Sequence, residues 1–267
     1  MAETQRPILV FDSGLGGLTV LRAVRAALPG RRVIYVADDA AFPYGDWPAQ
    51  TLCARLVELF SELLARYQPA IVVLGCNTAS TLALSDLRSA YPHTPFVGTV
   101  PAIKPAAQRS RSGVIALLST PATASQRYTR ELIDQFAVEC HVERVGSPLL
   151  ARLAEAHMQG DTVADADILG EISPCFVAHG SRRTDVVVLA CTHYPLLADS
   201  LRRLAPWPVI WLDPAEAIAR RVQALVAEHI AEGPASDRVE LDRAVFTRGI
   251  PKDSIRRLMA NEGLVFQ

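Results

Sequence analysis

Two short segments of this 267-residue sequence place a cysteine in almost the same setting. Residues 74–78 read LGCNT, and residues 189–193 read LACTH. A run of branched aliphatic residues precedes each segment, as is typical of a buried parallel strand. Cys76 and Cys191 therefore lie where open α/β sheets place their ligands, at the carboxyl end of a strand. The sequence predicts two matched half-sites that serve one ligand.

A thiol at such a position can act as a nucleophile or as a base. Its ordinary pKa of about 8.5 falls where the sulfur faces a helix N-terminus or a cation. One cysteine with one histidine would favour acyl transfer, whereas two equivalent thiols favour chemistry on the two faces of a planar intermediate. His193 follows Cys191 by two positions. We interpret it as a group that tunes or protonates that thiol, with a turn cap as the alternative.

A glycine-rich turn, DSGLGG at residues 12–17, follows the first apolar run. Its spacing does not match GxGxxG, and no lysine follows it as in a P-loop, so the turn does not favour nucleotide binding. Asp12 and Ser13 are its chemically useful residues, although a helix cap explains Asp12 equally well. A rigid aromatic loop, Pro43-Tyr44-Gly45, follows the second apolar run and by itself is also explained by a plain turn.

The elements that must position these residues alternate between strands and helices. We expect strands at residues 8–11, 33–36, 71–74, 96–98, 113–118, 141–145, 186–189 and 207–212, with a weak strand at 243–247. We expect helices at residues 18–28, 50–67, 124–136 and 151–180, another that ends near residue 232, and a short one in the tail.

This alternation predicts parallel sheets that are covered by helices. The pattern restarts near residue 113, so we expect an α/β fold of two similar lobes, each a mainly parallel sheet flanked by helices. The active site is expected in the cleft between them. The first lobe comprises residues 1–98 and 213–267, and the second comprises residues 99–212.

Composition excludes several classes of protein. The net charge of −1 gives no electrostatic support for binding nucleic acid or an anionic membrane. The sequence has no apolar stretch of membrane-spanning length and no secretory leader, so we expect a cytoplasmic protein. The five cysteines are odd in number and lack CxxC spacing, which argues against a disulfide framework or a thiolate zinc site. We interpret Cys53, Cys140 and Cys175 as packing residues.

The sequence also predicts a site without cofactor or metal. The chain has only two lysines, Lys104 and Lys252, and neither lies in a recognisable phosphate-binding context for pyridoxal phosphate. The HExxH motif is absent, and none of the six histidines pairs with another on a helix face.

Five motifs together identify a family. They are FDSGLGGLTVLRAV (11–24), FPYG (42–45), GCNTAST (75–81), VPAIKPA (100–106) and CTHYPLL (191–197). With them the chain resembles the glutamate racemases of the cofactor-independent aspartate/glutamate racemase superfamily over nearly its whole length. The resemblance implies interconversion of L- and D-glutamate, which supplies D-glutamate for peptidoglycan.

The resemblance also implies roles for individual residues. Cys76 would take the α-proton of D-glutamate with the help of Asp12. Cys191 would take that of L-glutamate with the help of His193 and Glu155. The other implied substrate contacts are Ser13, Pro43, Tyr44, Gly45, Asn77, Thr78, Thr120, Thr123 and Thr192.

The chain departs from the family in places. Many members read Cys-Pro about seven residues before the supporting glutamate, where this chain reads Ser147-Pro148. Other details resemble a proteobacterial subgroup, in which UDP-N-acetylmuramoyl-L-alanine activates some enzymes and a monomer is more common than a dimer. That activator and a monomeric state are therefore expectations.

Three alternatives stay open at this point. The first is an aspartate racemase, or a racemase or decarboxylase of another small acid, because pocket length decides the substrate. The second is a thiol-dependent acyl-transfer enzyme that uses Cys191 and His193 alone. The third is a non-catalytic amino-acid binding module.

Overall fold

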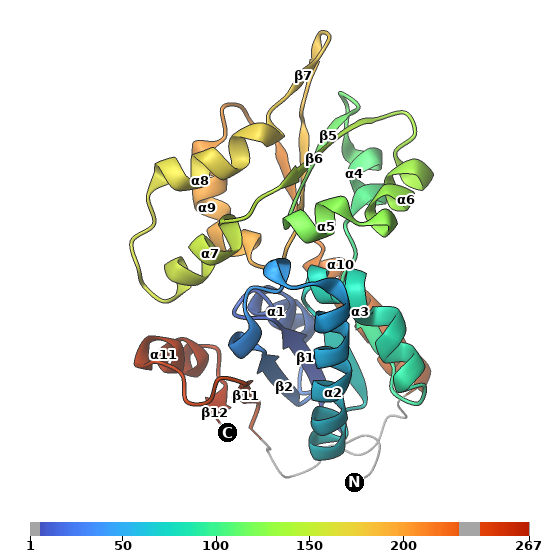
Figure 1. Cartoon of the computed structure of the whole chain (residues 1–267), viewed down its shortest axis with the longest axis vertical. Helices are drawn as coiled ribbons and strands as arrows, with labels where there is room; N and C mark the ends of the chain where they lie inside the picture. The colour runs from blue at the N-terminus through green and yellow to red at the C-terminus, as the bar shows by residue number, and fades with distance from the viewer. Residues whose placement is uncertain (1–5, 230–240, 267) are drawn as a thin grey trace. The chain divides into compact units, whose positions relative to one another are not determined.

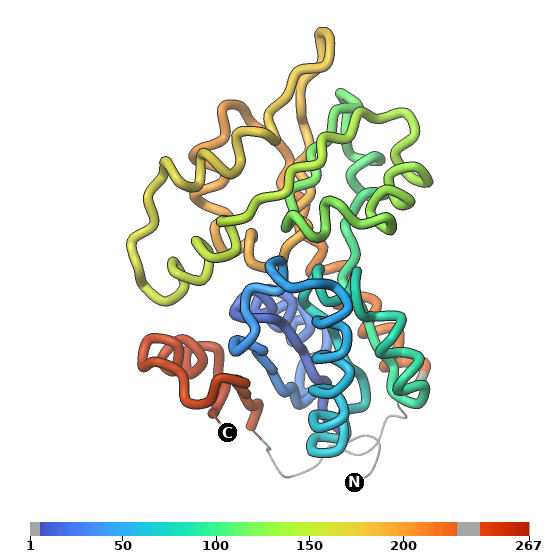
Figure 2. Tube along the Cα trace, in the orientation of Figure 1, coloured from blue at the N-terminus to red at the C-terminus, as the bar shows by residue number. Residues whose placement is uncertain are grey.

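The computed structural model describes residues 6–229 and 241–266 (Figure 1). The chain divides into two compact units: one contains the chain up to Thr99 and from Ala215 onward, and the other is Val100–Pro214. The expected division after residues 98 and 212 lies within two residues of these boundaries. In Figure 2 the chain can be followed by its colour from the first unit into the second and back into the first.

The first unit is built on a parallel six-stranded sheet with the order β12-β11-β2-β1-β3-β4. In chain order, the strands are β1 (Ile8–Asp12), β2 (Val33–Ala37), β3 (Ile71–Leu74), β4 (Phe96–Gly98), β11 (Arg243–Phe246) and β12 (Val265–Phe266). Branched aliphatic residues fill the central strands because helices bury both faces of a parallel sheet. Phe11 pairs with Val36 on one side and with Leu74 on the other, so these three strands end at the same edge.

Helices in two packed pairs, α1 with α10 and α2 with α3, accompany this sheet. Their bounds, with those of α11, are α1 (Leu18–Ala27), α2 (Ala49–Tyr67), α3 (Asn77–Ala90), α10 (Ala215–His229) and α11 (Asp253–Asn261). Two 3₁₀ turns, η2 (Asp39–Ala41) and η3 (Tyr44–Asp46), connect β2 to α2. The aromatic ring of Phe60 in α2 packs 4.9 Å from that of Phe11 and 5.4 Å from that of Phe96, which joins α2 to one face of the sheet.

The second unit has a parallel four-stranded sheet with the order β10-β9-β5-β6. The strands are β5 (Val114–Ser119), β6 (His141–Gly146), β9 (Val186–Ala190) and β10 (Ile210–Leu212). The helices are α4 (Ile103–Arg109), α5 (Pro121–Ser125), α6 (Arg127–Phe136), α7 (Leu150–Met158), α8 (Asp165–Ile172) and α9 (Ala198–Leu204), with 3₁₀ turns η4 (Ser173–Cys175) and η5 (Tyr194–Leu197). A short antiparallel pair, β7 (Ala178–His179) and β8 (Arg182–Arg183), precedes β9.

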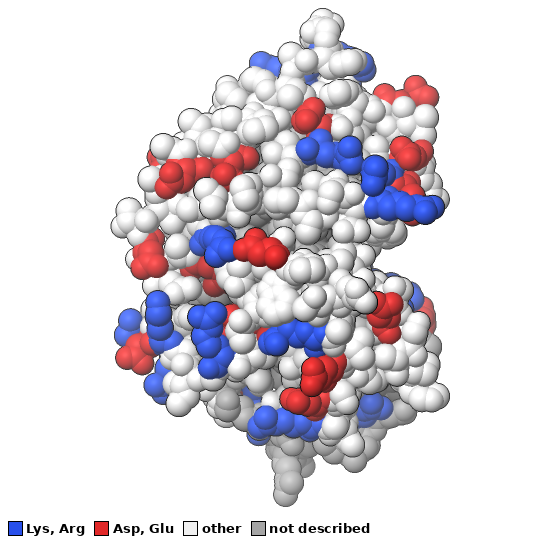
Figure 3. Space-filling view, viewed as in Figure 1, with Lys and Arg blue, Asp and Glu red and all other residues white. Residues whose placement is uncertain are grey.

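The surface agrees with the near-neutral composition. Acidic and basic side chains are interspersed on the visible face rather than gathered by sign (Figure 3). Among residues 6–229 and 241–266, every helix falls short of the length and apolar character that a bilayer crossing requires.

Every expected strand is present, although the one expected at 207–212 begins at Ile210 and the short strands β7, β8 and β12 were not expected. Several helix predictions were wrong in detail. The segment expected to be helical over 151–180 contains two helices, α7 and α8, which residues 159–164 separate, and its last residues belong to β7 and the turn after it. The helix expected at 124–136 begins at Pro121 and breaks at Gln126, which lies in extended backbone between α5 and α6. Helices α3, α4 and α9 were not given ranges, and the expected end near residue 232 lies outside the described residues.

Gly17 gives the first prediction, because a Cβ there would lie 2.6 Å from the Cβ of Asp12 and 3.1 Å from the Tyr35 ring. Gly17→Ala should lower the free energy of unfolding by about 1–3 kcal/mol, the range for overpacking a tight site. Gly170→Ala in α8 is the control, since a Cβ there meets nothing within 4 Å. It should raise stability by about 0.5–1 kcal/mol, as alanine does inside a helix. Urea unfolding measures both, and equal stability of the two variants would contradict the close contact.

Candidate functional site

Cys76 lies in the turn that leads from β3 into α3. It is the N-cap residue of that helix, and its Sγ accepts a hydrogen bond from the Ala79 backbone N–H at 3.5 Å. The Sγ also lies 3.8 Å from the Ser13 hydroxyl oxygen, at the end of the neighbouring strand β1. The positive end of the helix dipole and the amide donor both favour the thiolate form. The side chain is buried but retains 6% exposure.

Asp12 is the last residue of β1 and is fully buried. Its Oδ1 accepts a hydrogen bond from the Gly14 backbone N–H at 2.9 Å, so part of its charge is satisfied locally. Gly75 permits the close approach of the strands here, because a Cβ at that position would lie 3.2 Å from the Phe11 carbonyl oxygen and 3.7 Å from Asp12 Oδ2. Glycine in the turn before Cys76 thus lets this turn approach the backbone at the end of β1, where the Asp12 carboxylate lies at ordinary contact distance.

Asn77 is the clearest sign of a ligand in the first unit. The side chain is 2% exposed, yet within the described part of the chain its Oδ1 and Nδ2 have no hydrogen-bond partner. Buried amide groups are nearly always hydrogen-bonded, and leaving one unpaired costs about 1–3 kcal/mol. Its place directly after Cys76, beside the equally buried Thr78 and Ser13, indicates that a polar ligand completes this group.

Tyr44 and Gly45 are the first two residues of the 3₁₀ turn η3, and Pro43 directly precedes them. The Phe42–Pro43 peptide bond is cis, and Tyr44 is buried. Neither the Tyr44 nor the Gly45 backbone N–H has a partner among residues 6–229 and 241–266. Two unpaired amides at the start of a helical turn form an arrangement that binds carboxylates.

The Tyr44 hydroxyl group, unlike the backbone N–H groups, already has a hydrogen-bond partner among the residues that the structure describes. Its hydroxyl donates to Asp38 Oδ2 at 2.6 Å. Burial, followed by the negative charge of Asp38, raises the pKa of Tyr44 well above its ordinary value, and negative charge on Cys76 raises it further. Tyr44 therefore remains a neutral phenol.

Cys191 opens the matching site in the second unit, directly after β9. Its Sγ lies 3.9 Å from Nδ1 of His193, and Nε2 of His193 lies 2.9 Å from Oε1 of Glu155. Glu155 comes from α7, and all three residues are at most 9% exposed. The carboxylate can hold a protonated imidazole beside the thiol, so this trio can move a proton to or from sulfur.

Two threonines lie at the same sheet edge as Cys191, because Ser119 pairs with Ala190. Thr120 caps α5: its Oγ1 accepts from the Thr123 N–H at 3.3 Å and donates to the Thr123 hydroxyl at 3.2 Å. Thr123 is fully buried, and Thr192 is nearly so. The structure thus places the two cysteines and most of the expected polar residues at two strand edges, one in each unit, whereas Glu155 comes from α7 and Pro43–Gly45 from the turn after η2.

Two groups that support these sites were not predicted from the sequence. Asp38 holds Tyr44, as described above. In the second unit, Ser147 hydrogen-bonds to Glu171 and accepts from the Leu150 N–H at 3.1 Å, which caps the first turn of α7. The Ser147-Pro148 departure from the family pattern was the available signal for this cap. No three His, Cys, Asp or Glu side chains in the described ranges come together as a metal site.

Comparison with known proteins places these sites in a family. The model of the Asp/Glu/hydantoin racemases matches residues 18–222. Glutamate racemase of Brucella ovis is 56% identical over 262 residues, which cover 98% of this chain and 94% of the relative. Glutamate racemase of Brucella anthropi is 57% identical over 265 residues, covering 99% and 95%. The chain belongs to the glutamate racemase family. Family membership makes it an isomerase and confirms the resemblance inferred from the motifs.

Solved structures of glutamate racemases have the same fold. The Escherichia coli enzyme, solved with L-glutamate and the activator UDP-MurNAc-Ala, has a TM-score of 0.87 and 37% identity, covering 98% of this chain and 97% of that one. The Thermus thermophilus enzyme, solved with β-chloro-D-alanine, has a TM-score of 0.74 and 31% identity, covering 100% and 96%. The expected α/β fold of two lobes with mainly parallel sheets is thereby confirmed.

The remaining cysteines of this glutamate racemase family member differ from the two at the strand edges. Burial raises the pKa of Cys175 to about 12, and burial also raises the pKa of the half-buried Cys53 and Cys140. Cys175 is completely buried beside the sheet of the second unit, whereas the strand-edge thiols lie among polar groups. These features agree with the interpretation of the three as packing residues.

Cys175 supplies the second prediction. At pH 8 a thiol with a pKa of about 12 is ionised in roughly one molecule in ten thousand, and only the thiolate reacts readily. We expect iodoacetamide to leave Cys175 unmodified in the native protein and to label it after unfolding in urea. Peptide mass spectrometry measures the labelled fraction, with the half-buried Cys140 as the internal comparison. Native labelling of Cys175 as fast as that of Cys140 would contradict its burial.

Proposed function

We propose that this protein interconverts L- and D-glutamate by moving protons to and from the α-carbon with two cysteines and no cofactor. The observation that carries the proposal is the pair of strand-end thiols, each accompanied by its own buried acidic group. Cys76 has Asp12 at the adjacent strand end, and Cys191 has the His193–Glu155 pair. D-Glutamate made in the cytoplasm would supply peptidoglycan synthesis.

Each direction of the reaction needs one thiolate and one thiol. A thiolate removes the α-proton on one face, and the carbanion takes a proton from the opposite thiol on the other face. The sulfur that began as thiol ends as thiolate, so the next turnover runs in the reverse sense without a net proton change. Cys76 acts on D-glutamate and Cys191 acts on L-glutamate in this proposal.

The two thiols are prepared in different ways. The N-terminus of α3 and the Ala79 amide stabilise charge on Cys76, while Asp12 exchanges protons beside it. His193 serves Cys191, because a protonated imidazole held by Glu155 stabilises the neighbouring thiolate and can return a proton to it. Thiol pKa values near the working pH are what reversible proton transfer requires.

The carbanion itself is stabilised by hydrogen bonds to the substrate carboxylate. The unpaired amide of Asn77 supplies a donor next to Cys76, with Ser13 and Thr78 beside it. Thr120, Thr123 and Thr192 supply hydroxyl groups at the other strand edge. Such donors stabilise the enolate form most strongly where water is excluded. They take the place of the electron sink that a cofactor would provide.

The second carboxylate of glutamate is assigned to the Pro43–Gly45 turn. Its unpaired backbone N–H groups, from Tyr44 and Gly45, can bind both oxygens of one carboxylate. A carboxylate at a fixed distance from the α-carbon is what distinguishes glutamate from the shorter aspartate. This turn is therefore our proposed determinant of substrate length.

We also propose that the protein is a monomer activated by UDP-N-acetylmuramoyl-L-alanine. The support is similarity to the E. coli enzyme, whose solved complex contains UDP-MurNAc-Ala and which is 37% identical over nearly the whole chain. Activation by a peptidoglycan precursor would link the supply of D-glutamate to its consumption.

The substrate assignment predicts a clear preference. Circular dichroism should show loss of optical activity from either L- or D-glutamate, with kcat/KM for L-aspartate at least about a hundredfold lower, because aspartate cannot reach both carboxylate sites. The muramoyl precursor should raise the rate, with UDP-N-acetylglucosamine as the matched nucleotide control. Faster racemisation of aspartate than of glutamate would instead identify an aspartate racemase.

The two-base mechanism predicts that both thiols are required for racemisation. Cys76→Ala and Cys191→Ala should each lower kcat by about four orders of magnitude or more, since the loss of one base leaves one face of the α-carbon unserved. Cys140→Ala is the control and should racemise at the wild-type rate.

Racemisation by the wild-type enzyme in D₂O should place deuterium at Cα of the product, which NMR detects. Near-normal turnover by Cys76→Ala would favour chemistry by Cys191 and His193 alone. If the wild-type protein does not racemise glutamate, and the Cys→Ala variants bind glutamate as tightly as the wild type, the protein is a binding module.

A further inference from the structure

Asp38 is a buried carboxylate that the proposed chemistry leaves without a role. It follows β2 and has no exposed surface. Tyr44 Oη donates to its Oδ2 at 2.6 Å, and Arg55 donates through Nε at 2.8 Å and Nη2 at 2.6 Å. The Thr247 hydroxyl donates to Oδ1 at 2.6 Å. Four hydrogen bonds from three segments of the chain thus meet on one side chain.

This carboxylate stays ionised at neutral pH. Burial raises its pKa, but the hydrogen bonds from Arg55, Thr247 and Tyr44 outweigh burial and hold the pKa below its ordinary value. The hydrogen bond to Asp38 in turn raises the pKa of Arg55, so the pair remains an ion pair. Charge-assisted hydrogen bonds of this kind are the stronger ones in proteins.

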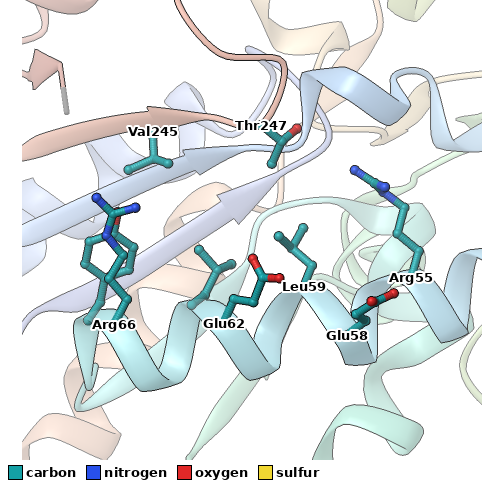
Figure 4. A pocket seen from close by; sticks show the side chains of 9 residues that line it. Arg55, Glu58, Leu59, Glu62, Arg66, Val245 and Thr247 are labelled. Carbon is teal, nitrogen blue, oxygen red and sulfur yellow. The ribbon is translucent and has the colours of Figure 1, made fainter.

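Thr247 connects Asp38 to the end of β11. The Thr247 N–H donates to the Ala37 carbonyl at 3.1 Å, and its hydroxyl oxygen accepts from the Ala40 N–H at 3.2 Å. Arg55 and Thr247 both border a cavity of about 440 Å³ between α2 and β11, and Figure 4 shows the Arg55 guanidinium on the side of the cavity where Thr247 lies. The segment that contains Asp38, which precedes η3, is therefore linked by hydrogen bonds to both α2 and the end of β11.

We propose that Asp38 is a positioning residue that holds Tyr44 and thereby sets the Pro43–Gly45 turn for the substrate carboxylate. The proposal rests on the assignment of that turn to substrate binding. The Tyr44 proton is committed to Asp38, so the phenol cannot also donate to a substrate oxygen. The tyrosine side chain anchors the turn from behind, and the backbone N–H groups of Tyr44 and Gly45 are left to bind the ligand.

Asp38→Asn tests this directly. Asparagine keeps the shape but offers one acceptor oxygen in place of two, so it cannot satisfy Tyr44, Arg55 and Thr247 together. We expect KM for glutamate to rise about tenfold, the scale of one charge-assisted hydrogen bond, with a smaller change in kcat. The pH profile of kcat/KM should keep its wild-type pKa values, because Asp38 transfers no proton.

Asp39→Asn is the matched control. Asp39 is the next residue and a partly buried carboxylate, whose Oδ1 accepts from the Arg248 N–H at 2.9 Å and which makes no hydrogen bond to Tyr44. Its KM should stay within about twofold of wild type, because Asp39 does not bind the tyrosine that anchors the turn and shares only the Thr247 hydroxyl with Asp38, at the longer distance of 3.5 Å. Thermal unfolding of both variants separates lost stability from lost positioning.

A double-mutant cycle with Tyr44→Phe tests whether Asp38 affects KM through Tyr44. If Asp38 acts through Tyr44, the Asp38→Asn/Tyr44→Phe protein should have the KM of the worse single variant rather than the product of the two increases. Thr247→Val keeps the carboxylate and should raise KM in the same direction by a smaller factor. The positioning role would be overturned if the KM increases of the two single variants multiply in the double variant. It would also be overturned by an unchanged KM in folded Asp38→Asn or by a shifted pH profile of that variant. Failure of the wild-type enzyme to racemise glutamate would instead overturn the proposed function.

Discussion

The whole arrangement depends on the in-register pairing of parallel strands. Phe11 pairs with Leu74 in one unit, and Ser119 pairs with Ala190 in the other. Each chain segment leaves its sheet at the same edge as its neighbours, so the next residues of adjacent strands meet there. Asp12 approaches the turn that carries Cys76 for this reason, and Thr120 lies at the edge from which Cys191 emerges.

The two units solve the same electrostatic problem with different groups. The proposed mechanism places a thiolate on each buried cysteine in turn, and a buried thiolate needs nearby positive charge or donors because burial penalises the charged form. In the first unit a helix N-terminus and one amide meet this need at Cys76. In the second unit no long helix begins at Cys191, since the 3₁₀ turn η5 follows, and an imidazole backed by Glu155 stands near the sulfur instead. Matched sequence settings have thus produced unlike partners.

Much of this could be predicted from local sequence. Branched aliphatic runs marked the strands, and the residues that follow them marked Asp12, Cys76 and Cys191. Local pattern did not reveal α4, which contains Pro105, or the break between α5 and α6 at Gln126. Asp38 was missed for a deeper reason. An aspartate after a strand resembles an ordinary cap, and its partner Thr247 lies 209 positions away, a pairing that only the fold brings about.

That long-range pairing bears on how the first unit is completed. Strand β11 joins the sheet beside β2 after the chain has passed through the entire second unit. Its last residues reach the segment that carries η2, since the Arg248 N–H binds Asp39 and the Thr247 hydroxyl binds Asp38. Asp38 would otherwise be a buried charge with one fewer donor, a costly state in a low-dielectric interior. The order of the turn at Tyr44 is therefore coupled to the docking of the final strands, and the turn that we propose as a substrate contact depends on the topology of the whole first unit.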